Sequence, residues 1–237
     1  MTSVQEFYDQ QWKSSGEDMF SLAFREAIAK SYTFLGNLQG KKILEVGCGS
    51  GEQASHLAAQ GAIVTVIDIS AESLKAAQDL AKQKKVELTA VKMDAEQLEF
   101  PAESFDLIYI NSTLMHVDQQ KVLQECSRVL VKGGKLAVIE PLRYAPLVQI
   151  YRWFSSYKKM NPHYATLKMF NQGKKYFSEH THQEFYLLSS ALLPVFSLKN
   201  RWLHRGYDAV STVDNFLLKI FPFLRHGCWV SVVKYTK

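Results

Sequence analysis

Three glycines at alternate positions, Gly47, Gly49 and Gly51, follow a short apolar run in the stretch LEVGCGSG. Glycine lets the backbone turn tightly and approach a ligand closely, and the first turn of a following helix offers unpaired N–H groups. The stretch therefore predicts a nucleotide-type binding turn. A tight strand-to-helix turn without a ligand is the alternative interpretation.

The residues around this turn indicate which ligand it would bind. The spacing is G-x-G-x-G, whereas dinucleotide sites use G-x-G-x-x-G, and Glu52 places a carboxylate where a pyrophosphate would lie. A ligand that lacks phosphates and carries a cation is therefore favoured.

Two aspartates follow neighbouring apolar runs. Asp68 ends VTVID, where a carboxylate can accept both hydroxyls of a ribose, or it caps the next helix in competition with Ser70. Asp94, in KMDAEQLEF, can accept from an adenine amino group, with Met93 and Ile69 sandwiching the ring. The alternative is that Asp94 is an ordinary loop residue. Its occurrence together with Asp68 and the glycine turn favours a ligand-binding role.

The elements that position these residues alternate regularly. Strand-like runs at 42–46, 62–68, 86–93, 105–110 and 135–141 are separated by helix-like stretches. This alternation predicts an α/β domain with a parallel sheet covered on both faces. After the last run, Thr181 and Glu184 form a T-x-x-E pattern that predicts a helix ending at Pro194. The segments 195–203 and 228–235 are then predicted as the final two strands, joined through a helix-like insertion at 204–227.

At this point the sequence resembles the class I S-adenosylmethionine-dependent methyltransferases. The resemblance rests on LEVGCGSG, Asp68, MDAEQLEF, SFDLIYINSTLMHV and RVLVKGGKLAVIEP, and covers roughly residues 41–141. It implies a Rossmann-like, doubly wound sheet of seven strands, six parallel and the last antiparallel, with S-adenosylmethionine as the cofactor. Methyl transfer is an in-line displacement on an activated carbon, so no metal is needed.

The resemblance also implies contacts with the cofactor. Gly47 and Gly49 would contact its methionine part, Asp68 its ribose, and Asp94 with Ala95 its adenine. Asn111 would contact its amino acid end, and Glu45 would lie near its ammonium group. The stretch EFYDQQW looks like a segment that closes over the cofactor, with Tyr8 and Trp12 as its contacts. An amphipathic helix packed on the sheet explains both aromatics equally well.

His116, in STLMHV, is the candidate general base, because a hydroxyl acceptor usually needs one. A structural His116 that caps the helix beginning near Asp118 fits equally.

The stretch from Pro141 to Ser178 contains no aspartate or glutamate but many basic and aromatic residues. Pro146 suits a first helical turn, and Leu147, Ile150, Tyr151 and Phe154 then share one face that must be buried. We expect a lid over the acceptor pocket, with Arg143, Tyr144 and Arg152 as polar contacts. Two alternatives stay open. One is a helical cap whose basic residues face water. The other is a membrane-touching surface that would admit a lipid-like acceptor, formed by Trp153, Phe154, Lys158 and Lys159 with Phe216, Leu217, Phe221 and Phe223 of the second insertion.

The chain is predicted as one domain over 1–237. Its parts are an N-terminal helical cover (1–40), a cofactor-binding core (41–141), a helical lid insertion (142–180), and a C-terminal helix with the last two strands and a second insertion (181–237, insertion 204–227). The predicted function is methyl transfer to an oxygen or nitrogen of a small aromatic or hydrophobic metabolite, as in natural-product biosynthesis. A nicotinamide-dependent oxidoreductase and a cofactor-binding regulatory subunit are kept as alternatives.

Composition limits the partners and the setting. The net charge of +5 in 237 residues is modest, and Asn111 is followed by Ser-Thr-Leu where DNA amine methyltransferases carry Pro-Pro-Tyr, so no nucleic acid partner is expected. Three cysteines without paired spacing, and the lack of a signal-like or bilayer-spanning run, favour a cytoplasmic protein with at most peripheral membrane contact. A monomer or homodimer is expected.

Overall fold

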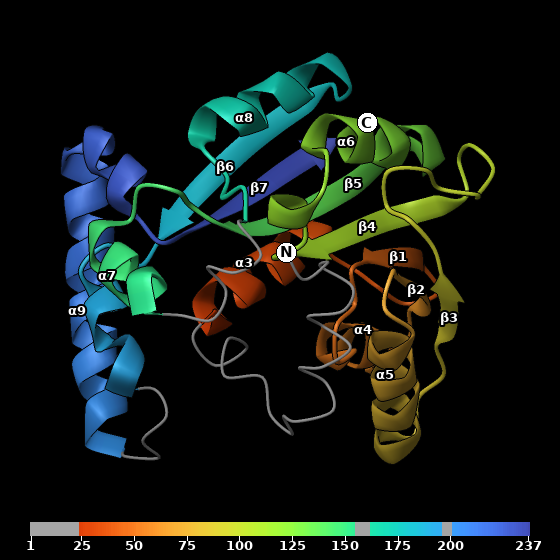
Figure 1. Cartoon of the computed structure of the whole chain (residues 1–237), viewed down its shortest axis with the longest axis horizontal. Helices are drawn as coiled ribbons and strands as arrows, with labels where there is room; N and C mark the ends of the chain where they lie inside the picture. The colour runs from red at the N-terminus through yellow and green to blue at the C-terminus, as the bar shows by residue number, and fades with distance from the viewer. Residues whose placement is uncertain (1–23, 155–161, 196–200) are drawn as a thin grey trace.

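The computed structural model describes residues 24–154, 162–195 and 201–237. Within them, seven strands form one sheet in the order β3-β2-β1-β4-β5-β7-β6 (Figure 1). The strands are β1 (Lys42–Val46), β2 (Ile63–Asp68), β3 (Thr89–Lys92), β4 (Phe105–Asn111), β5 (Leu130–Pro141), β6 (Glu179–Phe185) and β7 (Val230–Thr236). The strands β1 to β5 pair in parallel, and β7 is antiparallel to both β5 and β6. The predicted fold, with six parallel strands and an antiparallel last strand, is confirmed.

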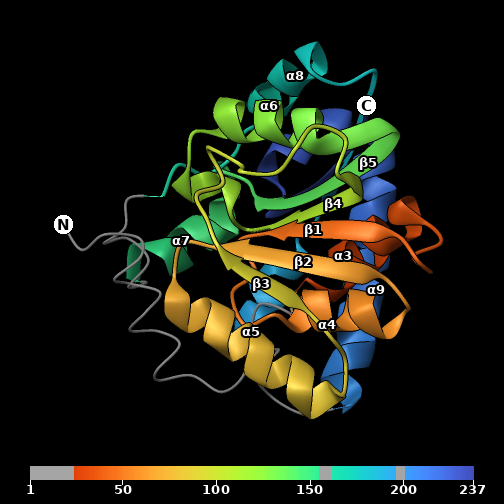
Figure 2. The same cartoon turned by 90° about the vertical axis from the view of Figure 1, so that its right-hand side faces the viewer.

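Helices cover both faces of the sheet (Figure 2). The α-helices are α3 (Arg25–Leu35), α4 (Glu52–Ala59), α5 (Ala71–Lys84), α6 (Gln119–Val129), α7 (Pro146–Phe154), α8 (Leu167–Gln172) and α9 (Arg201–Ile220). The short 3₁₀ segments are η1 (Leu114–His116), η3 (Gly173–Lys175), η4 (Ser189–Val195) and η5 (Pro222–Gly227).

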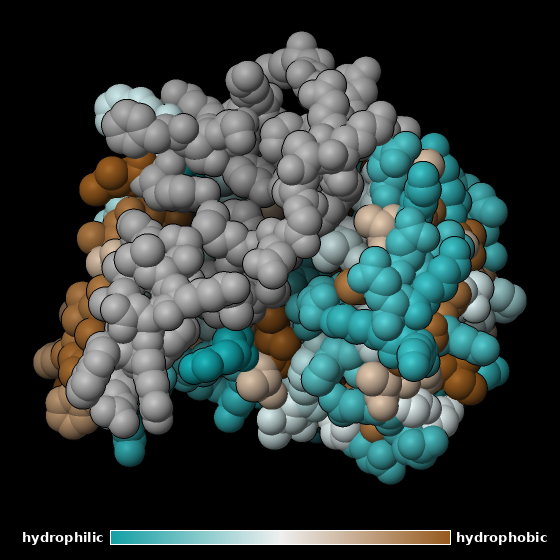
Figure 3. Space-filling model, turned by 90° about the horizontal axis from the view of Figure 1, so that it is seen from below, coloured by the Kyte–Doolittle hydropathy of each residue, from teal (hydrophilic) through white to brown (hydrophobic). Residues whose placement is uncertain are grey.

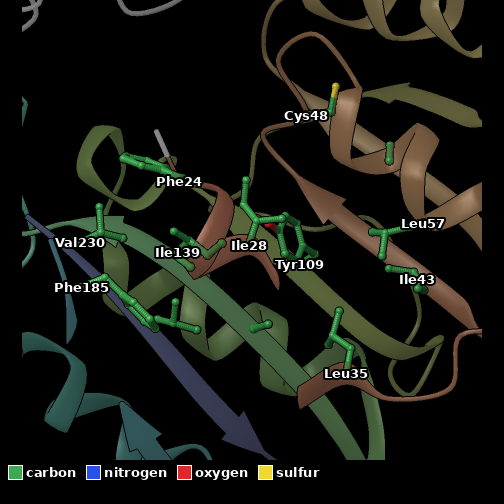
Figure 4. Close-up of a cluster of buried hydrophobic side chains, with 14 of the residues drawn as sticks. Phe24, Ile28, Leu35, Ile43, Cys48, Leu57, Tyr109, Ile139, Phe185 and Val230 are labelled. Atoms are coloured by element: carbon green, nitrogen blue, oxygen red, sulfur yellow. The ribbon is translucent and has the colours of Figure 1, made fainter. Parts of the chain in front are cut away.

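Two hydrophobic cores lie on the two faces because successive side chains of a strand point to opposite sides. In β1, Ile43 packs in the core that α3, α4 and α5 cover, while the next residue, Leu44, packs in the core that α6 and α8 cover. Figure 4 shows the first core, where Ile28 of α3 lies near Tyr109 of β4. The sheet is thereby held between two helical layers, which fixes the positions of the strand ends.

The carboxyl ends of β1, β2, β4, β5 and β6 lie along one edge of the sheet. The segments η1, α7 and η4 follow β4, β5 and β6 at this edge. The segment η5 enters β7 there too, since Val230 pairs with both Pro141 and Phe185. The helical segments of the second half of the chain therefore gather around the end of the sheet where the sequence predicts the ligands.

Two sequence predictions about the C-terminal part are wrong. The segment from Thr181 to Glu184 lies in strand β6 and does not begin a helix. Seven residues of β6 pair with β7, and the buried Glu184 carboxylate accepts a hydrogen bond from the Ser231 hydroxyl at 3.0 Å. Pairing with a strand distant in sequence thus outweighs a local capping pattern. The predicted strand at 195–203 lies partly outside the described residues, and its last three residues begin helix α9.

All three cysteines, Cys48, Cys126 and Cys228, are buried and none forms a disulfide. Burial raises the pKa of each thiol, that of Cys126 to about 12. In the described part of the chain, no helix combines the length and the hydropathy that crossing a bilayer requires. Those same residues hold no cluster of His, Cys, Asp or Glu side chains suited to a metal ion.

Candidate functional site

The glycine turn connects β1 to α4 with three left-handed glycines. Their φ angles are +72° at Gly47, +50° at Gly49 and +75° at Gly51. Packing adds a second requirement, because a Cβ on Gly47 would lie 2.2 Å from the Thr113 Oγ1 and one on Gly51 would lie 2.5 Å from the Ala77 Cβ. Gly47 and Gly51 are therefore required both by backbone conformation and by close neighbours.

Asp68, at the carboxyl end of β2, is tied to this turn. Its Oδ2 accepts the Gly49 N–H at 3.2 Å, and its Oδ1 accepts the Ser70 N–H at 2.9 Å. The N-cap of α5 is Ser70, whose hydroxyl accepts from the Ser73 N–H. The helix-cap interpretation of Asp68 is therefore wrong. A carboxylate offers about four acceptor positions, so these two bonds are compatible with further ones to a ligand's hydroxyls.

Asp94 and its neighbours lie beside Asp68 at the end of β3. The Met93 N–H donates to the Asp68 carbonyl at 3.1 Å. The exposed Asp94 side chain accepts the Glu96 N–H at 2.8 Å, which stabilises the local turn, and Ala95 is half-buried. Ile69 is 44% exposed at the same edge. The structure thus brings together the residues predicted to surround a ribose and an adenine.

Glu45, in β1, is buried beneath the glycine turn. Its pKa is raised to about 8, chiefly by burial; the backbone N–H of Ala54 in α4 opposes the shift, and nearby Asp68 adds to it. Its Oε2 has no hydrogen-bond partner among the described residues. The structure therefore places Glu45 next to the start of α4, inside the protein and below the turn that the ligand would contact.

The segment after β4 is held by a second buried carboxyl group, Glu140. Its Oε1 accepts the N–H groups of Thr113 at 2.7 Å and Leu114 at 2.6 Å. Burial raises the pKa of Glu140 to about 8. Ser112 has a φ of +57°, a strained conformation for a residue other than glycine. Its hydroxyl donates to the Asn111 carboxamide oxygen at 3.1 Å, so Asn111 is oriented at the same edge.

Glu140 was not among the predicted site residues. A charged residue inside the apolar run LAVIEP was the available signal, since a buried carboxylate needs partners. Those partners, the backbone N–H groups of Thr113 and Leu114, come from a segment more than twenty residues earlier. Sequence spacing does not reveal such a contact.

His116 ends the 3₁₀ turn η1, close to the lid segment. Burial lowers its pKa to about 4, so the imidazole is neutral at physiological pH. The neighbouring Met115 carbonyl accepts the His163 N–H at 2.8 Å. The N-cap of α6 is Asp118, which accepts from the N–H groups of Gln120 and Lys121. The helix-capping role considered for His116 is therefore filled by another residue.

The lid residues lie at the carboxyl ends of β4 and β5. Arg143 is exposed, its N–H donates to the Ala165 carbonyl at 2.9 Å, and its carbonyl accepts from Arg152 Nη1 at 3.2 Å. The Arg152 guanidinium lies 3.6 Å from the centre of the Tyr164 ring, and no acidic side chain in the described ranges pairs with it. Tyr144 is 59% exposed. Arg143 and Arg152 are thus brought together, whereas Tyr8 and Trp12 lie outside the described residues.

The predicted buried face of α7 is wrong in part. Leu147 is 40% exposed and Ile150 is 63% exposed, while Val148 is buried. The side chains of Tyr151 and Phe154 lie outside the description. The helix therefore begins at Pro146 as predicted but presents two of its predicted core residues to the outside.

Comparison with known proteins agrees with this geometry. The family model described as "Methyltransferase domain" matches residues 44–138. The ubiquinone biosynthesis O-methyltransferase of Coxiella burnetii is 38% identical over 100 residues, which cover 42% of this chain and 43% of that protein. The 27-O-demethylrifamycin SV methyltransferase of Amycolatopsis mediterranei is 37% identical over 103 residues, covering 42% and 38%.

The fold has close structural counterparts as well. The crystal structure of geranyl diphosphate C-methyltransferase from Streptomyces coelicolor, in complex with S-adenosyl-L-homocysteine, covers 98% of this chain and 97% of that one with a TM-score of 0.66. The sequence identity is 12%, so this likeness shows the shared fold alone. The curated relatives share less than half of their own length with this chain.

Proposed function

Because residues 44–138 match the family model of a methyltransferase domain, we propose that the protein is a class I S-adenosylmethionine-dependent methyltransferase that methylates an oxygen or nitrogen of a small aromatic or hydrophobic acceptor. S-adenosylmethionine is the cofactor of the family, which agrees with the sequence prediction. The relatives extend beyond the region that they share with this chain, so the activity of the whole protein and its acceptor are part of the proposal.

The contact between the glycine turn and Asp68 carries the proposal. The hydrogen bond from the Gly49 N–H to the Asp68 Oδ2 places a carboxylate beside a turn of left-handed glycines, at the carboxyl ends of adjacent parallel strands. Open α/β sheets bind their ligands at this position. The first residue of α4, Glu52, pairs with Lys84 at 2.6 Å, so a carboxylate occupies the position where a dinucleotide's phosphates would need donors.

The residues at this edge fit the cofactor by their chemistry. Gly47 and Gly49 would lie along its methionine part, Asp68 would accept the ribose hydroxyls, and Asp94 with Ala95 would border the adenine. Asn111 would bind the amino acid end, and Glu45 would act from below as a polar group near the ammonium. Bound there, S-adenosylmethionine supplies an activated methyl group, and the protein's part is to align the acceptor and exclude water.

The acceptor side of the site is assigned to His116, Arg143, Tyr144 and Arg152. A neutral imidazole at His116 can take the proton of an acceptor hydroxyl, because its lowered pKa keeps it unprotonated at pH 7. The names of both curated relatives refer to methylation at oxygen, which favours a hydroxyl acceptor over an amine. Arg152 and Arg143 favour an acceptor that carries partial or full negative charge.

The proposal extends to the setting of the enzyme. Buried, unpaired cysteines suit the cytoplasm, and we propose a monomer or homodimer that acts on a natural-product type metabolite without a nucleic acid partner.

Calorimetry with S-adenosylhomocysteine and with NAD tests the cofactor. We expect the protein to bind S-adenosylhomocysteine. The Asp68→Ala variant should bind it at least about tenfold more weakly, because two hydrogen bonds to the ribose hydroxyls are lost. The control Asp79→Ala, at an exposed position of α5, should bind it with unchanged affinity. Binding of NAD alone would replace the proposal with the oxidoreductase alternative. A radiolabelled-methyl assay with a panel of phenols and amines follows, and binding without any transfer would indicate a regulatory subunit.

A further inference from the structure

Large hydrophobic side chains are exposed on three elements at one end of the molecule. We call them the apolar patch, and its members are Leu147, Ile150 and Trp153 of α7, Val213, Phe216 and Ile220 of α9, and Phe221 and Phe223 at η5. Trp153 is 73% exposed, Phe223 69% and Phe216 62%. Figure 3 shows hydrophobic residues gathered along the left edge, the side on which Figure 1 places α7 and α9, and mainly hydrophilic residues on the right.

The three elements are anchored to the sheet by other residues. The buried Asp214 carboxylate of α9 accepts the N–H groups of Leu187, Leu188 and Ser189, and Tyr207 and Leu218 are buried as well. A Cβ on Gly227, the last residue of η5, would lie within 4 Å of Leu187 and of Pro146 in α7. The outward residues of α9 recur at positions 213, 216 and 220, so they form one helical stripe that is not buried against the rest of the fold.

The charges around the patch are positive in the described ranges. Arg143 and Lys219 are exposed near it, and the stretch 141–178 contains no acidic residue. Of the two aspartates of α9, Asp214 is buried and Asp208 lies in the other half of the helix, 3.8 Å from Arg25. An occupant of the patch therefore meets aromatic and aliphatic side chains beside cations.

We propose that the apolar patch docks on the surface of an anionic lipid bilayer. Aromatic and aliphatic residues beside cations match a bilayer interface, where apolar groups enter the acyl boundary and cations meet lipid phosphates. A second copy of the chain is a poorer occupant, because a two-fold interface would bring two equally cationic patches together. The proposal names a surface contact and adds no membrane-spanning segment.

The apolar patch lies where docking on a bilayer would help an acceptor reach the site. The helix α7 follows β5 at the edge of the sheet where Arg143 and Arg152 lie, so the patch borders the acceptor side of the site. A lipid-soluble acceptor would then reach the site from the bilayer without crossing water. This use rests on the proposed function, whereas bilayer binding itself does not require methyl transfer.

Co-sedimentation with vesicles tests the proposal. The full chain is mixed with vesicles of phosphatidylcholine alone and of phosphatidylcholine with phosphatidylglycerol, and we expect binding to the anionic vesicles. Phe216→Ser with Ile220→Ser should weaken it at least about tenfold, and Lys219→Ala about fivefold. Ile63→Ser and Lys75→Ala are matched controls, since Ile63 is 60% exposed on β2 and Lys75 is exposed on α5.

The affinity for S-adenosylhomocysteine, measured on every variant, shows whether each one folds. The absence of binding to anionic vesicles, or equal losses in the patch variants and in their controls, would overturn the proposal. A concentration-dependent dimer that the patch variants dissociate, without vesicle binding, would instead assign the patch to contacts between copies. Normal vesicle binding by a protein that transfers no methyl group would leave the proposal standing and count against the proposed function alone.

Discussion

Glu140 shows how one buried side chain can orient a site that it does not line. Its carboxyl group accepts the N–H groups of Thr113 and Leu114, which lie in the chain between Asn111 and His116. The Thr113 hydroxyl donates to the Val46 carbonyl at 3.1 Å and fills the space above Gly47. The side chain of Glu140 therefore connects the end of β5 to the end of β4, and Thr113 continues the connection to the glycine turn.

At this scale, His116 gives a direct prediction. His116→Ala should reduce kcat by about a hundredfold or more on a hydroxyl acceptor, because a general base contributes roughly that much, while the affinity for S-adenosylhomocysteine stays unchanged. With the pKa of His116 lowered to about 4, kcat of the wild type should be independent of this group between pH 6 and 8. Steady-state kinetics at saturating acceptor would measure both, with the exposed His226→Ala as control. Normal turnover of the variant would remove the base assignment.

The elements differ in how well local sequence predicts them. The central strands β1, β2 and β4 and the helices between them follow from apolar periodicity and glycine positions, because each is specified by its own residues. Strand β6 does not, since EHTHQEF carries a capping pattern and few apolar residues. Its conformation depends on β7, fifty residues later, which supplies seven backbone partners and the Ser231 hydroxyl for Glu184.

The same reasoning applies to the site. Gly47, Gly49 and Asp68 could be predicted because their spacing is itself the signal, and the structure brings them together. Glu140 and the arrangement of Arg152 over Tyr164 depend on tertiary contacts and could not. The outward direction of Leu147 and Ile150 was missed because a helical stripe shows which residues share a face, and not what covers that face.

Asp214 supports a prediction for helix α9. Its carboxylate accepts three N–H groups and, at 2.6 Å, the Ser189 hydroxyl, so Asp214→Ala leaves several buried donors without partners. We expect a loss of about 3 kcal/mol in the free energy of unfolding, measured by urea denaturation. The control Asp208→Ala, exposed on the same helix, should change stability by less than about 1 kcal/mol. Similar small effects of both substitutions would show that Asp214 does not anchor the helix.

The whole molecule should lose stability as the pH rises from about 4.5 to about 8. Glu45 and Glu140 ionise near pH 4.5 in an unfolded chain but keep their protons to about pH 8 in the folded one. Unfolding therefore releases protons between these values, and rising pH favours the unfolded state. His116 acts in the opposite sense, since its lowered pKa makes the folded state lose stability as the pH falls below 6.5.

Together these groups predict a stability maximum near pH 4.5, because the two carboxyl groups outweigh His116 above that pH, and a Tm that is lower at pH 8.5 than at pH 6.5. Calorimetric or fluorimetric melting across this range would measure it. The double substitution Glu45→Gln with Glu140→Gln should flatten the decline, whereas Glu99→Gln, at an exposed position, should leave it unchanged. A Tm that rises from pH 6.5 to 8.5 would contradict the assignment of these two carboxyl groups.

The burial of every cysteine has a practical consequence for following this protein in solution. With all three native thiols buried and their pKa values raised, thiol-directed dyes should find almost no thiolate at neutral pH in the folded protein. A single cysteine introduced at Val213, which is 48% exposed, would then be the one reactive position of the chain. An environment-sensitive fluorophore there would report, by its emission wavelength, the polarity that the outer side of α9 meets.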